Sequence, residues 1–105
     1  MAGLWEPMRG HIMAMVRCEV LEGPRDGFKT VGIAGATGNT EYLAIEEKFL
    51  VHEDGESFLP VLVIGYDARY NTALVQLPYE ADSGAKRVWV LKGTLKTEEA
   101  DKAYA

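Results

Sequence analysis

The sequence predicts a small, mainly β domain in which five or six short antiparallel strands close into a barrel. Several short segments alternate apolar and polar residues with a period of two, the pattern of strands with one buried face. Turn residues separate these segments about every eight to twelve positions, as in small barrels and sandwiches. No long helical segment lies between them, so a parallel sheet with crossover helices is not expected.

Length and composition limit the classes of function. The 105 residues fit one domain, and 48% of them are hydrophobic, which is enough for a sizeable core. The net charge of −5 disfavours binding to nucleic acid or to anionic membrane surfaces. The single cysteine, Cys18, excludes an internal disulfide and is typical of a reducing compartment, so a cytoplasmic location is expected. No apolar stretch approaches the roughly 20 residues of a membrane span.

The N-terminal segment differs from the rest of the chain. We interpret residues 1–14 as a flexible arm and residues 15–105 as a single small barrel domain, because methionines, glycines and a proline crowd into the start. From residue 15, apolar and charged side chains alternate, which predicts a half-buried first strand. Its apolar members are Val16, Cys18 and Val20.

The middle of the chain predicts two further strands and one ambiguous segment. Residues 28–34 have strand character and lead into a glycine-rich loop over 35–39. Residues 41–51 fit either a helix or two short strands. Strands are expected there, because the neighbouring segments are β.

A sharp hairpin signal follows. Asp54-Gly55 lies between apolar runs, which predicts a type I′ turn with positive φ at both residues. Pro60 cannot donate to a sheet, so it is expected at an edge, at a bulge or at a strand start. Residues 61–64 are apolar on both faces and predict the most buried strand.

The C-terminal part predicts two more strands, over 72–77 and 86–91, with an acidic loop over 79–85 between them. Thr97 is placed to cap a short C-terminal helix. The spacing of the strands resembles that of SH3-like barrels, in which a meander of bent antiparallel strands encloses one core. This resemblance is to a fold and carries no function by itself.

Catalytic and metal sites are not expected. Cys18, Ser57 and Ser83 are the nucleophiles considered, and nothing in the pattern brings His11 or His52 to a serine. Cys18 lies on the apolar face of a strand, where an inert thiol is expected. The candidate metal ligands are His52, Asp54 and Glu56. The turn at Gly55 breaks the strand alternation that would place them on one face, so no metal or other cofactor is expected.

The glycine-rich segment over 32–40 contains a G-x-x-G-x-x-G pattern. It matches neither the dinucleotide-binding fingerprint nor the Walker loop. A phosphate-binding loop is also followed by a helix, and this condition is met only if residues 41–51 are helical. Phosphate binding is therefore not expected there.

A binding surface is predicted around the last strand. If Val88 and Val90 face the core, Arg87 and Trp89 share the outer face, a combination typical of binding hot spots. The alternative makes Trp89 the central core aromatic, with its neighbours inverted. Nearby loop residues extend the candidate surface. They are Tyr66, Tyr70, Tyr79 and Asp82.

These observations lead to one functional hypothesis and one alternative. The first is a non-enzymatic interaction module that holds a protein segment, or another copy of itself, on this aromatic surface. The alternative is a barrel that binds single-stranded nucleic acid by stacking bases on exposed aromatics. Its phosphate-binding cations are Arg69, Lys86, Arg87 and Lys92.

Overall fold

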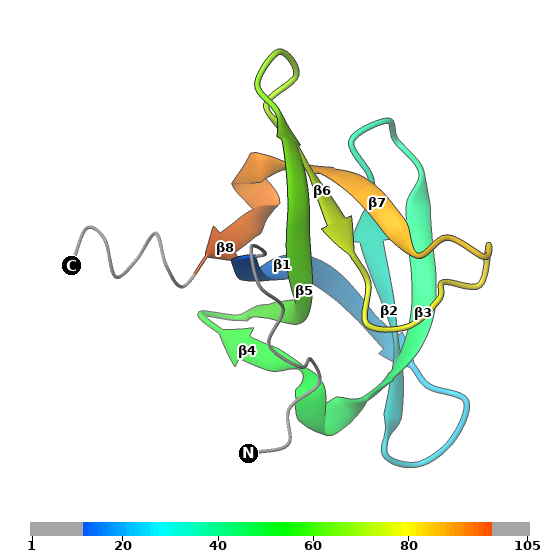
Figure 1. The fold of residues 1–105 in the computed structure, drawn as a ribbon. Helices are drawn as coiled ribbons and strands as arrows, with labels where there is room; N and C mark the ends of the chain where they lie inside the picture. Colours follow the sequence, from blue (N-terminus) through cyan, green and yellow to red (C-terminus); the bar gives the residue numbers. More distant parts are fainter. Residues whose placement is uncertain (1–11, 98–105) are drawn as a thin grey trace.

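The computed structural model describes residues 12–97 and confirms a mainly β domain whose antiparallel sheet curls into a nearly closed barrel (Figure 1). The strands are β1 (Ile12–Glu22), β2 (Phe28–Ala34), β3 (Thr40–Glu46), β4 (Val51–Glu53), β5 (Glu56–Asp67), β6 (Thr72–Gln76), β7 (Arg87–Leu91) and β8 (Leu95–Thr97). Two short 3₁₀ turns are η1 (Glu47–Phe49) and η2 (Lys92–Thr94). Within residues 12–97, no helix is long and apolar enough to cross a membrane.

The sheet consists of two three-stranded meanders, not one continuous meander. Its order is β3-β2-β1-β5-β6-β7, so the meanders meet where β1 pairs with β5. Strand β1 is long enough to join the two meanders, because residues 12–18 pair with β5 and residues 19–22 pair with β2. Strand β8 pairs with residues 14–16 of β1, and β4 pairs with the start of β5.

Loops bridge the gap between the terminal strands β3 and β7. The Ala36 amide donates to the Trp89 carbonyl at 2.8 Å, and the Asp82 amide donates to the Tyr42 carbonyl at 2.8 Å. The Ser83 hydroxyl donates to Oε1 of Glu41 at 2.5 Å. The loops after β2 and β6 therefore close the barrel and fix the position of β7.

The core is made from the inward positions of the alternating strands. Strand β5 is buried on both faces over residues 61–63, as the apolar run predicts. Burying one Leu, Ile or Val side chain contributes about 1.5–3 kcal/mol, so this interior is the main source of stability. The largest fully buried side chains are Ile33, Leu43, Ile45, Leu59, Leu62, Val16, Val31, Val61, Val75 and Val90.

Two local predictions are confirmed in the β4–β5 region. Asp54 and Gly55 have φ values of 51° and 80°, and they connect a directly paired Glu53 and Glu56, as a two-residue type I′ hairpin requires. Pro60 pairs with Met15 of β1 on one side of β5, and on the other side it lies between the parts of β5 that pair with β4 and with β6, a local edge as expected for a residue without an N–H.

Residues 41–51 form β3, η1 and the start of β4, so the expectation of strands is confirmed. Strand β1 begins at Ile12, before the expected domain boundary at residue 15, and the remainder of the arm lies outside the described residues. The helix expected after Thr97 also falls outside them, and the described chain ends in η2 and β8.

Candidate binding groove

Strand β7 presents its aromatic face outward. Val88 and Val90 are buried, opposite Val75 and Ala73 of β6. Trp89 lies between the two valines on the opposite face and is 42% exposed. This parity excludes the interpretation of Trp89 as the central core aromatic.

A hollow of about 470 Å³ lies against this outer face, and we call it the β7 groove. Its lining comes from the β2–β3 loop, the β5–β6 hairpin, β6 and β7. The hairpin and the β2–β3 loop rise at the same end of the barrel (Figure 1). The lining residues are Ala36, Thr37, Asp67, Tyr70, Thr72, Trp89 and Leu91.

Backbone hydrogen bonds hold both walls of the β7 groove. On one side the Ala36 amide donates to the Trp89 carbonyl, as described for barrel closure. On the other side the Lys92 amide donates to the Asn71 carbonyl at 3.1 Å. Asn71 adopts a φ of 54°, a left-handed conformation that asparagine tolerates and that turns the hairpin into β6. The groove is therefore pre-formed.

The floor of the groove contains a buried hydroxyl. Thr72 is 7% exposed and is the only buried polar or charged residue within residues 12–97. Its hydroxyl makes no hydrogen bond to another residue of this described part. Buried polar groups are nearly always hydrogen-bonded, so this hydroxyl marks a place where a bound molecule can supply the missing partner.

The hairpin wall carries a carboxylate, a cation and an aromatic ring. Asp67, at the end of β5, accepts hydrogen bonds from Nε of Arg69 at 3.3 Å and from its Nη2 at 3.2 Å. The Arg69 amide also donates to Asp67, at 3.0 Å. Cζ of Arg69 lies 5.4 Å from the centre of the Tyr70 ring, within cation–π range. The arginine side chain is 80% exposed, so this ion pair contributes at most about 1 kcal/mol.

The structure brings together only part of the predicted surface. Tyr70 and Trp89 line the groove, and Arg87 lies two residues from Trp89 on the same face of β7, outside the lining. Tyr66 pairs with the inward-facing Ala73. Its ring is exposed, and the ring centre lies 5.0 Å from Nζ of Lys92. The remaining two predicted residues, Tyr79 and Asp82, lie in the β6–β7 loop.

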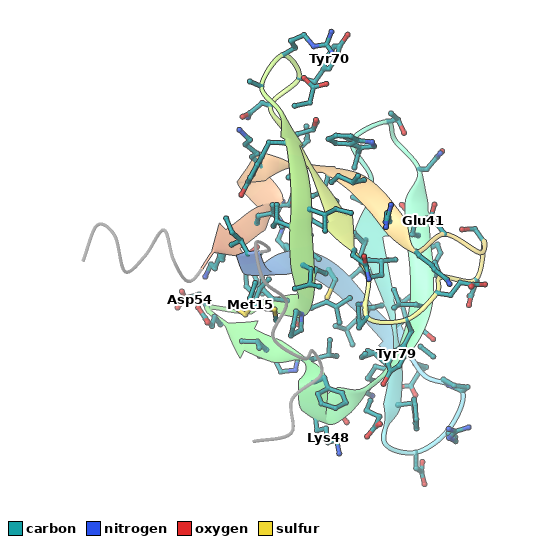
Figure 2. The ribbon with its side chains drawn as sticks, in the orientation of Figure 1. Met15, Glu41, Lys48, Asp54, Tyr70 and Tyr79 are labelled. Atoms are coloured by element: carbon teal, nitrogen blue, oxygen red, sulfur yellow. The ribbon has the colours of Figure 1, made fainter. Side chains whose placement is uncertain are left out.

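Figure 2 shows how far this predicted surface is divided. Tyr70 lies at the tip of the β5–β6 hairpin, and Tyr79 lies towards the other end of the barrel. The residues that the sequence reasoning missed are Ala36, Thr37, Asp67, Thr72 and Leu91. Leu91 could have been found, because it has the same strand parity as Trp89.

The glycine-rich loop serves the fold. A Cβ atom at Gly32 would lie 2.9 Å from Cε1 of Tyr42, and Gly38 has a φ of 97° in the turn. Strand β3 follows this loop, so the strand–turn–helix context of a phosphate loop is missing. The loop contributes Ala36 and Thr37 to the β7 groove instead.

One expectation about catalytic residues is wrong. No histidine was expected near a serine, but Nδ1 of His52 lies 2.8 Å from Oγ of Ser57. The cause is the two-residue turn, whose register places these residues directly opposite each other. The pair is exposed, and no carboxylate within residues 12–97 is hydrogen-bonded to Nε2 of His52. This contact therefore lacks the orienting group of a catalytic triad.

Cys18 lies half-buried in β1. Desolvation raises the pKa of its thiol from an ordinary value of 9.0 to about 11. Because the thiolate is the reactive form, this environment makes the side chain a poor nucleophile at neutral pH. It fits the structural role expected from the sequence.

We expect Cys18 to react with iodoacetamide at pH 8 about 100-fold more slowly in the folded protein than in urea, because its pKa is about two units higher. The folded-state rate should keep rising up to about pH 11, whereas the rate in urea should level off near pH 9. Because the folded thiol keeps its proton to a higher pH than the unfolded thiol, the fold loses stability as pH rises from 9 towards 11. Equal rates at pH 8 would contradict the burial of the thiol.

The chain matches no family model, and no significant similarity to a curated protein or to a solved structure was found.

Proposed function

We propose that this chain is a non-enzymatic interaction module that binds an extended segment of a partner protein in the β7 groove. The observation that carries this proposal is a cluster of exposed apolar side chains around a pre-formed hollow. Trp89 is 42% exposed and Leu91 is 50% exposed, and Tyr70 completes the wall. Tryptophan and tyrosine in such settings are the usual anchors of protein interfaces.

A protein segment fits the chemistry of the groove. Its volume of about 470 Å³ holds one or two side chains, and it lies open at the surface. A peptide backbone carries both donors and acceptors, so it can satisfy the buried hydroxyl of Thr72. Small barrels hold extended segments in aromatic-lined grooves by this combination of contacts.

The single unpaired thiol supports a location in the cytoplasm.

Binding to single-stranded nucleic acid has less support. Of the cations considered for phosphate contacts, Arg69 is paired with Asp67, and Nζ of Lys92 lies over Tyr66. The groove lining contains no cation, so it offers no partner for a phosphate group. The net charge of −5 acts in the same direction.

The test uses random 12-residue peptides displayed on phage and selected on the full wild-type chain. We expect Trp89→Ala to weaken binding of the selected synthetic peptides at least about 30-fold, because truncating a hot-spot residue commonly costs 2 kcal/mol or more. The measurement is fluorescence polarisation of labelled peptide. Tyr79→Ala is the matched control, since it removes an exposed aromatic ring outside the groove and should leave binding unchanged.

Three outcomes would contradict this proposal. Equal peptide affinity for wild type and Trp89→Ala, with both folded, would exclude the groove. A concentration-dependent dimer that Trp89→Ala abolishes in sedimentation would make a second copy the occupant. Binding of oligothymidylate that falls steeply with salt would favour the nucleic-acid alternative. If Trp89→Ala fails to fold, Leu91→Ala takes its place, because this side chain is half exposed at the groove edge.

A further inference from the structure

Asp67, which lines the β7 groove, is already paired with a cation of the protein itself, although this cation does not line the groove. Two guanidinium nitrogens of Arg69 donate to the two carboxylate oxygens of Asp67, and the guanidinium lies near the ring of Tyr70. We infer that the groove recognises a cationic side chain of the partner segment, a guanidinium or an ammonium group on an aliphatic stem, and that this group displaces Arg69 from Asp67. This inference rests on the function proposed above.

The charge of the groove favours a cation. Asp67 is the only charged residue among the described lining residues, and the rest of the lining is neutral. Arg69 balances this carboxylate in the free protein, and the lining holds no cation with which an anionic ligand could pair. The net charge of −5 adds attraction for a basic segment over longer range.

The neutral lining also suits a cation on an aliphatic stem. Tyr70 and Trp89 supply aromatic rings, which attract cations, and tryptophan does so most strongly. Leu91 supplies an apolar surface for the stem. The unsatisfied hydroxyl of Thr72 can accept a hydrogen bond from an ammonium or guanidinium N–H.

Arg69 is placed to be displaced. Its side chain is 80% exposed, and an exposed ion pair contributes little to stability. Only one residue separates Arg69 from Asp67, so the pair holds no distant parts of the fold together. Leaving Asp67 therefore does not unfold the domain, and Arg69 acts as a weak internal competitor. Its removal should strengthen binding of an external cation.

The test titrates the ¹⁵N-labelled full chain with two uncharged-backbone probes, N-acetyl-arginine amide and N-acetyl-norleucine amide. The readouts are the amide of Thr72 and the indole N–H of Trp89. We expect the arginine compound to bind at least about fivefold more tightly than norleucine, its uncharged aliphatic counterpart. Arg69→Ala should tighten arginine binding about threefold by removing the competitor. Asp67→Asn should make the two affinities converge.

Arg87→Ala is the matched control. Like Arg69→Ala it removes one arginine, but from the face of β7 that carries Trp89 and outside the groove lining, so it should leave both affinities unchanged. Equal affinities for arginine and norleucine in wild type would overturn the cationic specificity, as would weaker arginine binding in Arg69→Ala. Absence of any shift at Thr72 and Trp89 would also overturn it. The phage-selected peptides decide separately whether the groove binds a partner at all, so the two failures are distinguishable.

Discussion

Gly23→Ala will lower the free energy of unfolding by about 2–4 kcal/mol, although it adds a single methyl group. A Cβ atom at this position would lie 2.0 Å from the carbonyl oxygen of Phe28 and 2.8 Å from the amide nitrogen of Lys29. Both atoms belong to the backbone of β2, so no rotation of a side chain can relieve the overlap. The loop after β1 must move, which disturbs the pairing of Glu22 with Lys29. Urea unfolding followed by circular dichroism measures this loss.

Gly93→Ala is the control for this substitution. No atom lies within 4 Å of a Cβ built at Gly93, and its backbone does not have a positive φ. We therefore expect a change within about 0.5 kcal/mol, or slight stabilisation through the lower entropy of the unfolded chain. Wild-type stability for Gly23→Ala would mean that the loop over 23–27 shifts freely, and it would contradict the close approach to β2.

Local patterns were enough to predict most of the strands. Alternation reports directly which side chains share a face, so Val88 and Val90 could be paired as core candidates from the sequence. The Asp54-Gly55 turn was predictable because its φ values depend on these two residues alone. The same turn also fixes the pairing of His52 with Ser57, so their contact was available to sequence reasoning and was missed.

The groove was less predictable because barrel closure creates it. Thr37 and Trp89 line the same hollow only because the β2–β3 loop bonds to β7, and no local pattern indicates that contact. The register between β5 and β6 also shifts between Val63 and Gly65. Strand alternation in the sequence does not predict which side chains share a face on the two sides of such a bulge. Tyr66 was expected with Tyr70 in the β5–β6 loop, but β5 extends to Asp67, so Tyr66 lies within the strand.

Leu59→Ala will destabilise the domain by about 3 kcal/mol, within the range for fully buried leucines. Leu59 has no exposed surface and lies in β5, directly opposite Val16 of β1, where the two meanders join. Truncation leaves a cavity at this junction, and the surrounding strands cannot close it without breaking their pairing. The midpoint of thermal unfolding should fall by at least about 10 °C for a domain of this size.

Leu91→Ala removes the same atoms from the edge of the β7 groove. It distinguishes a side chain that stabilises the fold from one that binds the partner segment. Because Leu91 is 50% exposed, we expect a loss of less than about 1 kcal/mol, together with weaker binding of the selected peptides. If Leu91→Ala instead destabilised the domain as much as Leu59→Ala, Leu91 would be packed in the native protein. The groove would then be closed in solution, and an apolar side chain that contributes to the fold could not also be free to receive a partner.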